Sequence, residues 1–371
     1  MREYLLTTFV AAAVTYLVAG PVRAVAVRFG VVAEVRDRDV HDVPIPRLGG
    51  VAMLVGLAAA LLVASKMPLL RSVFATGDEP KGVLLASVVI CLVGVVDDVW
   101  GLDAITKLAG QSLAAGLMAL QGVQLLWLPG PGQTIALGPA EGTLITVLVV
   151  VVTVNAVNFV DGLDGLAAGI VGISASAFFL FSYLLSVQNA IERALTPSLI
   201  SAVLAGVCAG FLVHNFNPAR IFMGDSGSMV IGLLLAASSI TLTGRLDPAS
   251  YSGLNLFPTL LPLLLPFAVL AVPFLDLVLA VVRRTRARRS PFSADKQHLH
   301  HRLLEIGHSH RRAVLIMYGW TALLAYLAVG LAFLPTWLAL VLAAVAFATL
   351  VIVVRGPRRA ARAAAGRAGR G

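Results

Sequence analysis

Long apolar runs alternate with short polar segments along almost the whole chain, as far as residue 354. Most runs are about 17 to 25 residues long, which is the length of an α-helix that crosses the hydrocarbon core of a bilayer. The pattern therefore predicts an all-α polytopic membrane protein with about eleven transmembrane helices. The predicted spans are residues 4–22, 48–65, 81–96, 105–123, 143–158, 165–187, 198–214, 228–243, 259–282, 313–334 and 336–354.

Composition agrees with a membrane protein and leaves no room for a soluble domain. Hydrophobic residues make up 58% of the 371 residues and charged residues 13%, with a mean hydropathy of +0.91. Soluble domains have about a quarter of their residues charged. We expect one integral membrane domain over residues 1–354. Residues 355–371 are rich in Ala, Arg and Gly, and we expect them to form a basic, disordered cytoplasmic tail.

Basic residues gather on one side of the predicted spans. Alternate loops and the tail hold 22 of the 28 Lys and Arg residues, which the positive-inside rule assigns to the cytoplasm. The N-terminus is then outside and the C-terminus cytoplasmic. The net charge of +9 is explained by contact with anionic membrane lipids, so we expect no nucleic-acid partner.

Acidic residues are few, and six of them fall at the cytoplasmic ends of predicted helices. Carboxylates brought together in a partly desolvated place raise one another's pKa unless a cation is present. Such a gathering indicates a divalent metal or a proton-handling role. The six residues are Asp97, Asp98, Asp103, Asp161, Asp164 and Asp225.

Two of the acidic loops have distinct patterns. In "VVDDVWGLDAITKLAGQ", adjacent Asp97 and Asp98 end one helix and point about 100° apart, so they can serve different partners, and Lys107 lies in the start of the next helix. Two solvated carboxylates at a turn are the alternative. In "NAVNFVDGLDGLAAG", a polar residue recurs every third position and lines one side of a helix end. Asn amides suit the edge of a heterocycle such as uracil, and helix capping is the alternative. These polar residues are Asn155, Asn158 and Asp161.

The loop "NPARIFMGDSGS" leads into a predicted helix that begins near Gly224. Residues 224–228 would then lie at a helix N-terminus, where free N–H groups favour anions, so we expect a phosphate cradle. Asp225 would be repelled by a phosphate unless Mg²⁺ lay between them, since Mg²⁺ binds one or two carboxylates together with phosphate oxygens. The alternative is that Asp225 is only the N-cap of the helix.

Two further segments face the same side. The basic loop 283–312 holds five of the seven histidines, with His298 and His301 on one helix face. Zinc is conceivable there, but the loop better fits a diphosphate, and a solvated basic loop is the alternative. The rigid turn "VPIPRLGG" directs Arg47 toward the cytoplasmic face, or is merely the turn into the second span. Asp276 and Arg283 share a helix face and can form a structural pair.

Five motifs together resemble one family. "PRLGG", "DDVWGL", "NAVNFVDGLDGL", "NPARIFMGDSGS" and "HLHH", in this order, are similar to those of the polyprenyl-phosphate N-acetylhexosamine-1-phosphate transferases. The forms "PRLGG" and "HLHH" resemble the WecA/TagO branch, which uses UDP-N-acetylglucosamine (UDP-GlcNAc). The resemblance runs from the first predicted span through the eleventh.

The resemblance implies roles for particular residues. Asp225 is similar to a Mg²⁺ ligand, with Mn²⁺ as a substitute metal, and Asp97 and Asp98 resemble a catalytic pair beside the lipid phosphate. Residues resembling the uridine pocket include Phe222, which would stack on uracil. The other predicted substrate-binding residues are Asn155, Asn158, Asp161, Asp164, Asn215, Arg47 and Lys107, and the histidines predicted to hold the sugar diphosphate are His298, His300 and His301.

The implied reaction transfers GlcNAc-1-phosphate from UDP-GlcNAc to undecaprenyl or decaprenyl phosphate and releases UMP. It would take place in a bacterial plasma membrane, as the first lipid-linked step of cell-envelope glycopolymer synthesis, and a homodimer is one option for the assembly. The alternatives are another donor, UDP-MurNAc-pentapeptide or UDP-GalNAc, and a secondary transporter, although a transporter would place its ionisable groups near the midplane. We expect direct attack by the lipid phosphate, with Asp97 accepting the residual proton, in preference to a covalent aspartyl intermediate.

Overall fold

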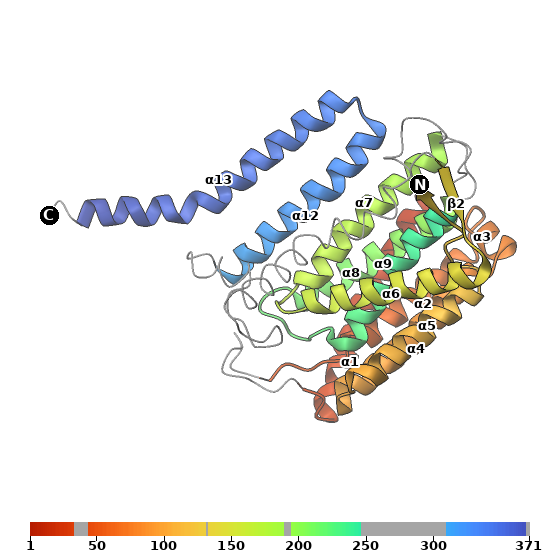
Figure 1. The fold of residues 1–371 in the computed structure, drawn as a ribbon. Coiled ribbons are helices and arrows are strands. Elements are labelled where there is room, and N and C mark those ends of the chain that lie inside the picture. The colour runs from red at the N-terminus through yellow and green to blue at the C-terminus, as the bar shows by residue number, and fades with distance from the viewer. Residues whose placement is uncertain (33–43, 131–132, 189–193, 246–308, 369–371) are drawn as a thin grey trace, which may run out of the picture. The chain divides into compact units, whose positions relative to one another are not determined.

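The computed structural model of the chain describes residues 1–32, 44–130, 133–188, 194–245 and 309–368 (Figure 1). The chain divides into two compact units, Met1–Phe267 and Ala268–Gly371. The single membrane domain expected over residues 1–354 stays a prediction.

The first unit is a bundle of helices with one short hairpin. Apolar segments become helices in lipid because their backbone polar groups must be hydrogen-bonded within the segment. The described elements are α1 (Arg2–Arg28), α2 (Gly49–Ala64), α3 (Arg71–Thr76), α4 (Glu79–Trp100), α5 (Ala104–Leu120), β1 (Trp127–Gly130), β2 (Gln133–Ala136), α6 (Pro139–Val160), α7 (Leu166–Gln188), α8 (Leu195–Asn215) and α9 (Gly224–Arg245).

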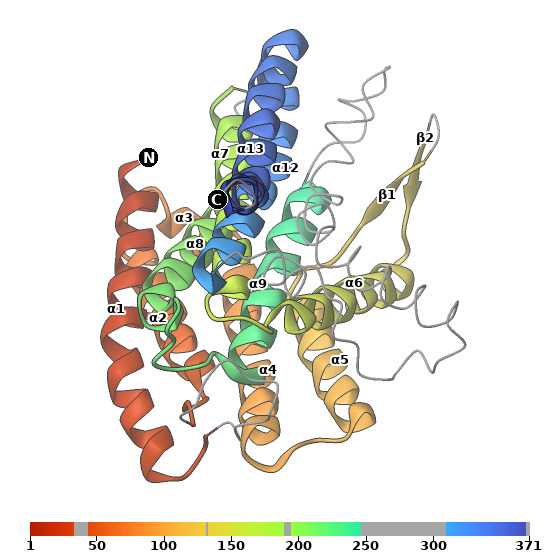
Figure 2. The same ribbon diagram turned by 90° about the vertical axis from the view of Figure 1, so that its left-hand side faces the viewer.

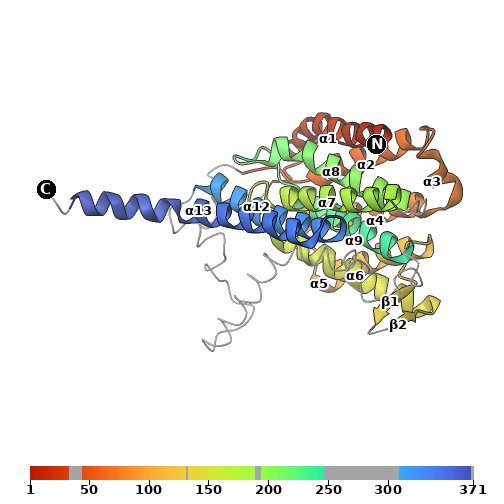
Figure 3. The ribbon, with the colours of Figure 1, turned by 90° about the horizontal axis from the view of Figure 1, so that it is seen from above.

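Helix α9 lies in the middle of the first unit and presents its N-terminus to the candidate site. It packs against α2, α4, α6, α7 and α8, and its apolar stretch is wholly buried. Figures 2 and 3 show α1 and α5 on opposite sides of it. The sequence of α9 suits this place because it is rich in Gly, Ala, Ser and Thr, which let helices approach closely in a membrane. Its hydroxyls donate to carbonyls one turn earlier, as Ser238 does to Leu234.

The apolar helices make this a multi-pass membrane protein. Among the described residues, eight helices are long and apolar enough to span a bilayer, and α2 and α5 are shorter apolar helices. Ten of the eleven predicted spans coincide with helices of the structure. The remaining one, residues 259–282, lies outside the described residues. The exact number of spans and the orientation of the chain stay predictions.

Strands β1 and β2 form an antiparallel hairpin that the sequence analysis did not predict. Trp127 pairs with Ala136 and Gly130 with Gln133, and Leu137 donates a further backbone hydrogen bond to Leu126. The stretch "PGPG" at residues 129–132, which runs from the end of β1 to the start of β2, is a strong turn signal. The surrounding residues were interpreted only as a loop between two spans, so this signal was missed.

The second unit contains α12 (His310–Phe333) and α13 (Thr336–Ala368). The two helices pack through an edge-to-face contact between Trp320 and Phe347, whose ring centroids are 5.5 Å apart. We expected residues 355–371 to be disordered, but α13 continues as helix to Ala368. Ala and Arg, which dominate this tail, are among the strongest helix formers.

Candidate functional site

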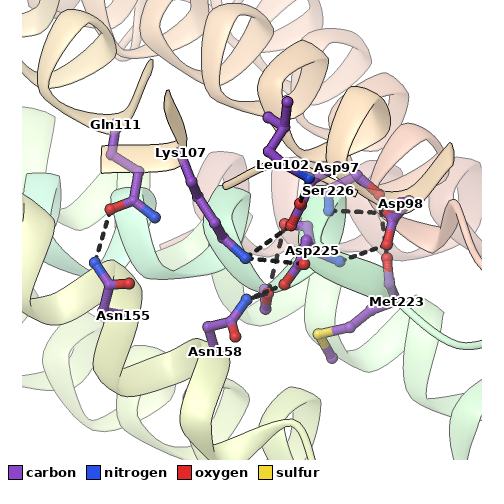
Figure 4. Close-up of polar contacts among 11 residues, drawn as sticks. Asp97, Asp98, Leu102, Lys107, Gln111, Asn155, Asn158, Met223, Asp225 and Ser226 are labelled. Carbon is purple, nitrogen blue, oxygen red and sulfur yellow. Dashed lines mark hydrogen bonds and ion pairs between the residues drawn. The ribbon is translucent and has the colours of Figure 1, made fainter. Parts of the chain in front are cut away.

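Loops that are far apart in the sequence meet at one end of the helices of the first unit. Gly49 and Gly50, at the start of α2, donate backbone hydrogen bonds to the carbonyl oxygens of Phe222 and Met223, just before α9. Asp98, near the end of α4, reaches the first turn of α9 from another side (Figure 4). The first turn of α9 is therefore the point on which the segments "PRLGG", "DDVWGL" and "NPARIFMGDSGS" converge.

Glycine makes this convergence possible. A methyl group added at Gly50 or Gly94 would lie well within 3.0 Å of backbone atoms of Ser226, closer than real Cβ atoms come. Helices α2 and α4 thus press directly on the backbone of α9. The glycines of "PRLGG" allow this close approach of the backbones. The sequence predicted only a rigid turn for this segment.

Lys107 bridges two carboxylates that come from different helices. Its Nζ lies 2.8 Å from Asp97 Oδ2 and 2.9 Å from Asp225 Oδ2. The Lys107 side chain is only 19% exposed, so the charges interact in a partly dry place, where Coulombic attraction is stronger than in water. The other oxygen of Asp97 accepts the N–H of Leu102 at 2.6 Å. Lys107 was predicted to bind substrate, and the structure places it as the cation between Asp97 and Asp225.

Asp98 caps the N-terminus of α9. Its Oδ1 accepts the N–H of Asp225 at 2.9 Å and its Oδ2 the N–H of Ser226 at 3.1 Å. First-turn amides have no partner within their own helix. The prediction of a phosphate cradle at residues 224–228 is wrong for the amides of Asp225 and Ser226, because both already donate to the Asp98 carboxylate. Asp225 is not the N-cap either, since it is the second residue of α9.

Two asparagines of α6 face the same cluster. Asn158 Nδ2 donates to Asp225 Oδ1 and, at 3.0 Å, to Ser228 Oγ. Asn155 lies one turn earlier, and its Nδ2 donates to Gln111 Oε1 at 2.7 Å. Ser228 belongs to the segment 224–228 that was predicted as a phosphate cradle, whereas Gln111 was not predicted as a site residue. The spacing of Gln111 four residues after Lys107 puts both on one face of α5, and this signal could have found it.

Asp164 and Asn215 tie two loops of the site together. The Asn215 side chain accepts the N–H of Gly165 and donates to the carbonyl of Ile221, both at 3.0 Å. Asp164 Oδ2 accepts the N–H of Ala219 at 3.0 Å. Both side chains are buried. These contacts help to set the shape of the loops, and the prediction that both residues line a uridine pocket stays a prediction.

Asp161 follows α6 and belongs to the same electrostatic environment. Burial, and after it the negative charges of Asp225 and Asp98, raise the pKa of Asp161 to about 8, although Arg47 acts in the opposite direction. An acid with so high a pKa holds its proton unless positive charge is added nearby. The raised pKa of Asp161 therefore reflects its burial first and the neighbouring carboxylates second.

The pH dependence of stability should report this environment. An acid whose pKa is raised by folding binds its proton more tightly in the folded state, so Asp161 stabilises the fold below the ordinary pKa of 3.8. This contribution is lost as the pH rises through about 8. We expect the melting temperature of the wild type to fall relative to that of Asp161→Asn between pH 5 and pH 9 in metal-free detergent. Parallel melting curves for the two proteins would contradict the assignment.

Removing the bridging cation should destabilise the metal-free protein. Lys107→Gln leaves the Asp97 and Asp225 carboxylates facing each other without a charged partner, which should cost about 1 to 3 kcal/mol of unfolding free energy. Added Mg²⁺ should recover more stability in the variant than in the wild type. Chemical denaturation in detergent, with and without Mg²⁺, measures both effects.

Lys81→Gln is the matched control for that comparison. Lys81 also pairs with an aspartate, Asp78, at 2.6 Å, but both side chains are more than half exposed. Exposed pairs contribute about 0 to 1 kcal/mol, so the control should be close to wild type and insensitive to Mg²⁺. Equal losses in the two variants would show that Lys107 is an ordinary surface lysine.

Some predicted residues are not placed in this cluster by the structure. Phe222 is half-buried before α9, and its backbone N–H donates to the carbonyl of Pro46. Arg47 is half-buried just before α2, close enough to Asp161 to lower the pKa of that residue. Their substrate contacts stay predictions. The segment that contains His298, His300, His301, Asp276 and Arg283 lies outside the described residues.

The donor set beside Asp225 fits a hard cation. Within the described residues, no group of three or more His, Cys, Asp or Glu side chains is arranged to hold a metal. Mg²⁺ does not need such a cage, because it binds one or two carboxylates and takes its other oxygens from water and phosphate. Asp225 offers a carboxylate beside the Asn158 amide, and its neighbour Lys107 shows that positive charge is favourable at this place.

Comparison with known proteins places this fold and site in a class. The model of the family described as "Glycosyl transferase family 4" matches residues 81–243, from α4 through most of α9. This range contains Asp97, Asp98, Lys107, Asn158 and Asp225. The fold and the carboxylate cluster thus define an integral membrane protein of glycosyltransferase type.

Full-length relatives resolve the class further. The chain is 48% identical to the decaprenyl-phosphate N-acetylglucosaminephosphotransferase of Mycobacterium tuberculosis over 88% of this chain and 82% of that protein. It is 47% identical to the protein of the same name from Mycolicibacterium smegmatis, over 96% and 89% of the two chains. The undecaprenyl-phosphate alpha-N-acetylglucosaminyl 1-phosphate transferase of Yersinia pestis is 29% identical over 92% and 88%. The chain belongs to glycosyl transferase family 4.

Proposed function

We propose that this protein transfers GlcNAc-1-phosphate from UDP-GlcNAc to a polyprenyl phosphate, giving polyprenyl-diphosphate-GlcNAc and UMP. The observation that carries the proposal is the cluster of Asp97, Lys107, Asn158 and Asp225 at one end of a membrane helix bundle. An acceptor whose chain lies in the bilayer and whose phosphate lies at its surface requires a site at that depth. Two relatives named for this reaction, which the chain matches over 82% and 89% of their lengths, support the same activity.

Mg²⁺ is the proposed cofactor, with Asp225 as its protein ligand and the Asn158 amide beside it. A bound Mg²⁺ supplies neutralisation of charge on transferring phosphoryl oxygens. The contacts of Asp225 support this assignment, because its carboxylate already pairs with the Lys107 ammonium and accepts a hydrogen bond from the Asn158 amide. The first turn of α9 also favours negative charge on Asp225, through its dipole.

The described side chains are suited to orient phosphates and to balance charge. Lys107, held between two carboxylates, is fixed in place and can interact with a phosphate oxygen without losing further side-chain entropy. The lipid phosphate has its second pKa near 6, so at pH 7 it is mostly a dianion and needs little help from a base.

The contacts of Asp97 change the role expected for it. One carboxylate oxygen accepts from the Lys107 ammonium and the other from the Leu102 N–H. A carboxylate stabilised in this way is a weak base and a weak nucleophile. We therefore propose that Asp97 positions Lys107, in place of the earlier expectation that it accepts a proton, and direct attack by the lipid phosphate is retained.

The finer identity of the substrates follows the relatives. Decaprenyl phosphate is the proposed acceptor, since the names of the two relatives at 47% and 48% identity specify it. The site is proposed to face the cytoplasm of a bacterial cell, where UDP-sugars are made. UDP-MurNAc-pentapeptide and UDP-GalNAc remain comparison donors. A transporter is not favoured because the ionisable cluster lies at the helix ends.

The test is transfer of label from UDP-[¹⁴C]GlcNAc into butanol-extractable lipid by purified protein, with decaprenyl phosphate and Mg²⁺. The product should form, require Mg²⁺ and return its label to UDP-GlcNAc when UMP is added, because one phosphoanhydride replaces another. Undecaprenyl phosphate and the two other donors run in parallel decide the acceptor and the sugar. Absence of lipid product with all three donors would reject the function.

A further inference from the structure

The N-terminus of α9 is the electrostatic centre of the site, and a side chain of the protein already occupies it. Aligned peptide dipoles place partial positive charge at a helix N-terminus, and the free N–H groups there bind anions. Here the anion is the Asp98 carboxylate, which accepts from Asp225 at 2.9 Å and from Ser226 at 3.1 Å. One N–H on each oxygen gives a two-point attachment, which fixes orientation as well as distance.

We propose that Asp98 is a positioning residue, which orients the Asp225 carboxylate by clamping the first turn of α9 to the end of α4. The proposal rests on the proposed function and assigns Asp98 a role away from the substrate. The backbone N–H of Asp225 itself donates to Asp98, so any movement of the Asp98 carboxylate is transmitted directly to Asp225. Its neighbour Asp97 meanwhile holds Lys107, so the end of α4 fixes both partners of the Lys107–Asp225 ion pair.

The backbone before Asp225 is shaped to receive this carboxylate. Gly224 has a φ of +66°, a conformation that L side chains rarely adopt. A Cβ at this position would overlap with both oxygens of Asp98. Gly50 of α2 and Gly94 of α4 leave no room for a Cβ beside the Ser226 backbone in the same turn. The first turn of α9 is therefore held sterically by glycine contacts and electrostatically by Asp98.

A consequence follows for substrate binding. The N–H groups of Asp225 and Ser226 already donate to the Asp98 carboxylate. A diphosphate could bind these N–H groups only by displacing that carboxylate, which is part of the protein. Phosphate oxygens must then be bound by side-chain cations or by a cation held at Asp225. The adjacent carboxylates therefore have different roles: Asp97 holds Lys107, and Asp98 holds the first turn of α9.

Hydrogen–deuterium exchange of substrate-free and metal-free protein tests the clamp directly. In Asp98→Ala, the peptide covering residues 222–229 should exchange at least about tenfold faster than in the wild type, because the first-turn amides lose their acceptor. Asp98→Asn, which keeps the size of the side chain and one acceptor oxygen, should lie between the two. Sodium formate, which can replace the missing carboxylate, should slow the exchange of Asp98→Ala again.

Transfer kinetics test the positioning role. A displaced Asp225 should lower kcat about 100-fold in Asp98→Ala and change KM for UDP-GlcNAc by less than about threefold, with partial recovery in formate. Asp103→Ala is the matched control, since Asp103 caps its own helix by accepting from Ile105 at 3.0 Å and Thr106 at 3.1 Å. It should speed exchange at the start of α5 and leave residues 222–229 unchanged.

Two results would overturn the proposal. Unchanged exchange with a large loss of kcat would mean that Asp98 acts on the substrate, and faster exchange with unchanged kcat would mean that the clamp does not position Asp225. A wild type without transferase activity would instead reject the proposed function. Exchange is measured without substrate, so that failure would be recognised separately from failure of the clamp.

Discussion

Asp225→Asn is expected to lower the rate of GlcNAc-1-phosphate transfer about 1,000-fold at saturating substrates and ordinary Mg²⁺. Asn has nearly the same shape as Asp but no charge, so it removes the negative group proposed to hold Mg²⁺ and leaves the packing of α9 unchanged. Lys107 keeps its contact with Asp97 Oδ2 at 2.8 Å, so the fold should melt close to the wild-type temperature. The loss would then belong to the chemistry of the site.

Initial rates at Mg²⁺ concentrations from micromolar to tens of millimolar measure this prediction. Excess Mg²⁺ should recover part of the activity if Asp225 acts through metal affinity. Asp78→Asn is the matched control, because Asp78 precedes α4, at the end opposite Asp97, and forms an exposed pair with Lys81. An Asp225→Asn enzyme with more than a tenth of wild-type activity and a normal Mg²⁺ requirement would remove Asp225 from the site.

The parts of the fold that depend on local pattern were predictable from the sequence. Apolar length alone located ten helices of the structure, because a helix in lipid needs little beyond a continuous apolar run. The grouping of Asp97, Asp161 and Asp225 at one end of the helix bundle was also predictable. Their loops follow the third, fifth and seventh predicted spans, so all three loops lie on the same side of the membrane. Helix ends fix the side of the bundle on which a residue lies, but not its contacts.

The pairing of individual side chains was not predictable in the same way. Asp97 and Asp98 differ by one position, yet one holds Lys107 and the other caps α9, and this choice depends on where α9 lies relative to α4. The phosphate-cradle prediction failed for this reason: the rule about helix N-termini is correct, but it does not say which anion binds. Gln111 was missed because its partner, Asn155, lies on another helix.

The packing of α4 against α9 also makes Gly94 important for the site, although its place in an apolar run does not indicate this. Gly94→Ala is expected to lower transfer activity about 100-fold and the free energy of unfolding by about 2 kcal/mol. The added methyl group would overlap with the N and Cα atoms of Ser226, and backbone atoms cannot rotate away as a side chain can. Helix α9 must therefore move away from α4, and Asp225 moves with it, away from Lys107 and Asp98.

Gly116→Ala separates this effect from the general response of a membrane helix to alanine. Gly116 lies inside α5 with no atom within 4 Å of the position of an added Cβ. Alanine there should leave activity unchanged and raise stability slightly, because Ala favours helix by about 1 kcal/mol over Gly. Transfer rates and denaturation curves of the two variants in the same detergent measure the difference. A Gly94→Ala protein as active and as stable as Gly116→Ala would show that α4 and α9 are not in backbone contact, and the clamp formed by Asp98 would lose its steric basis.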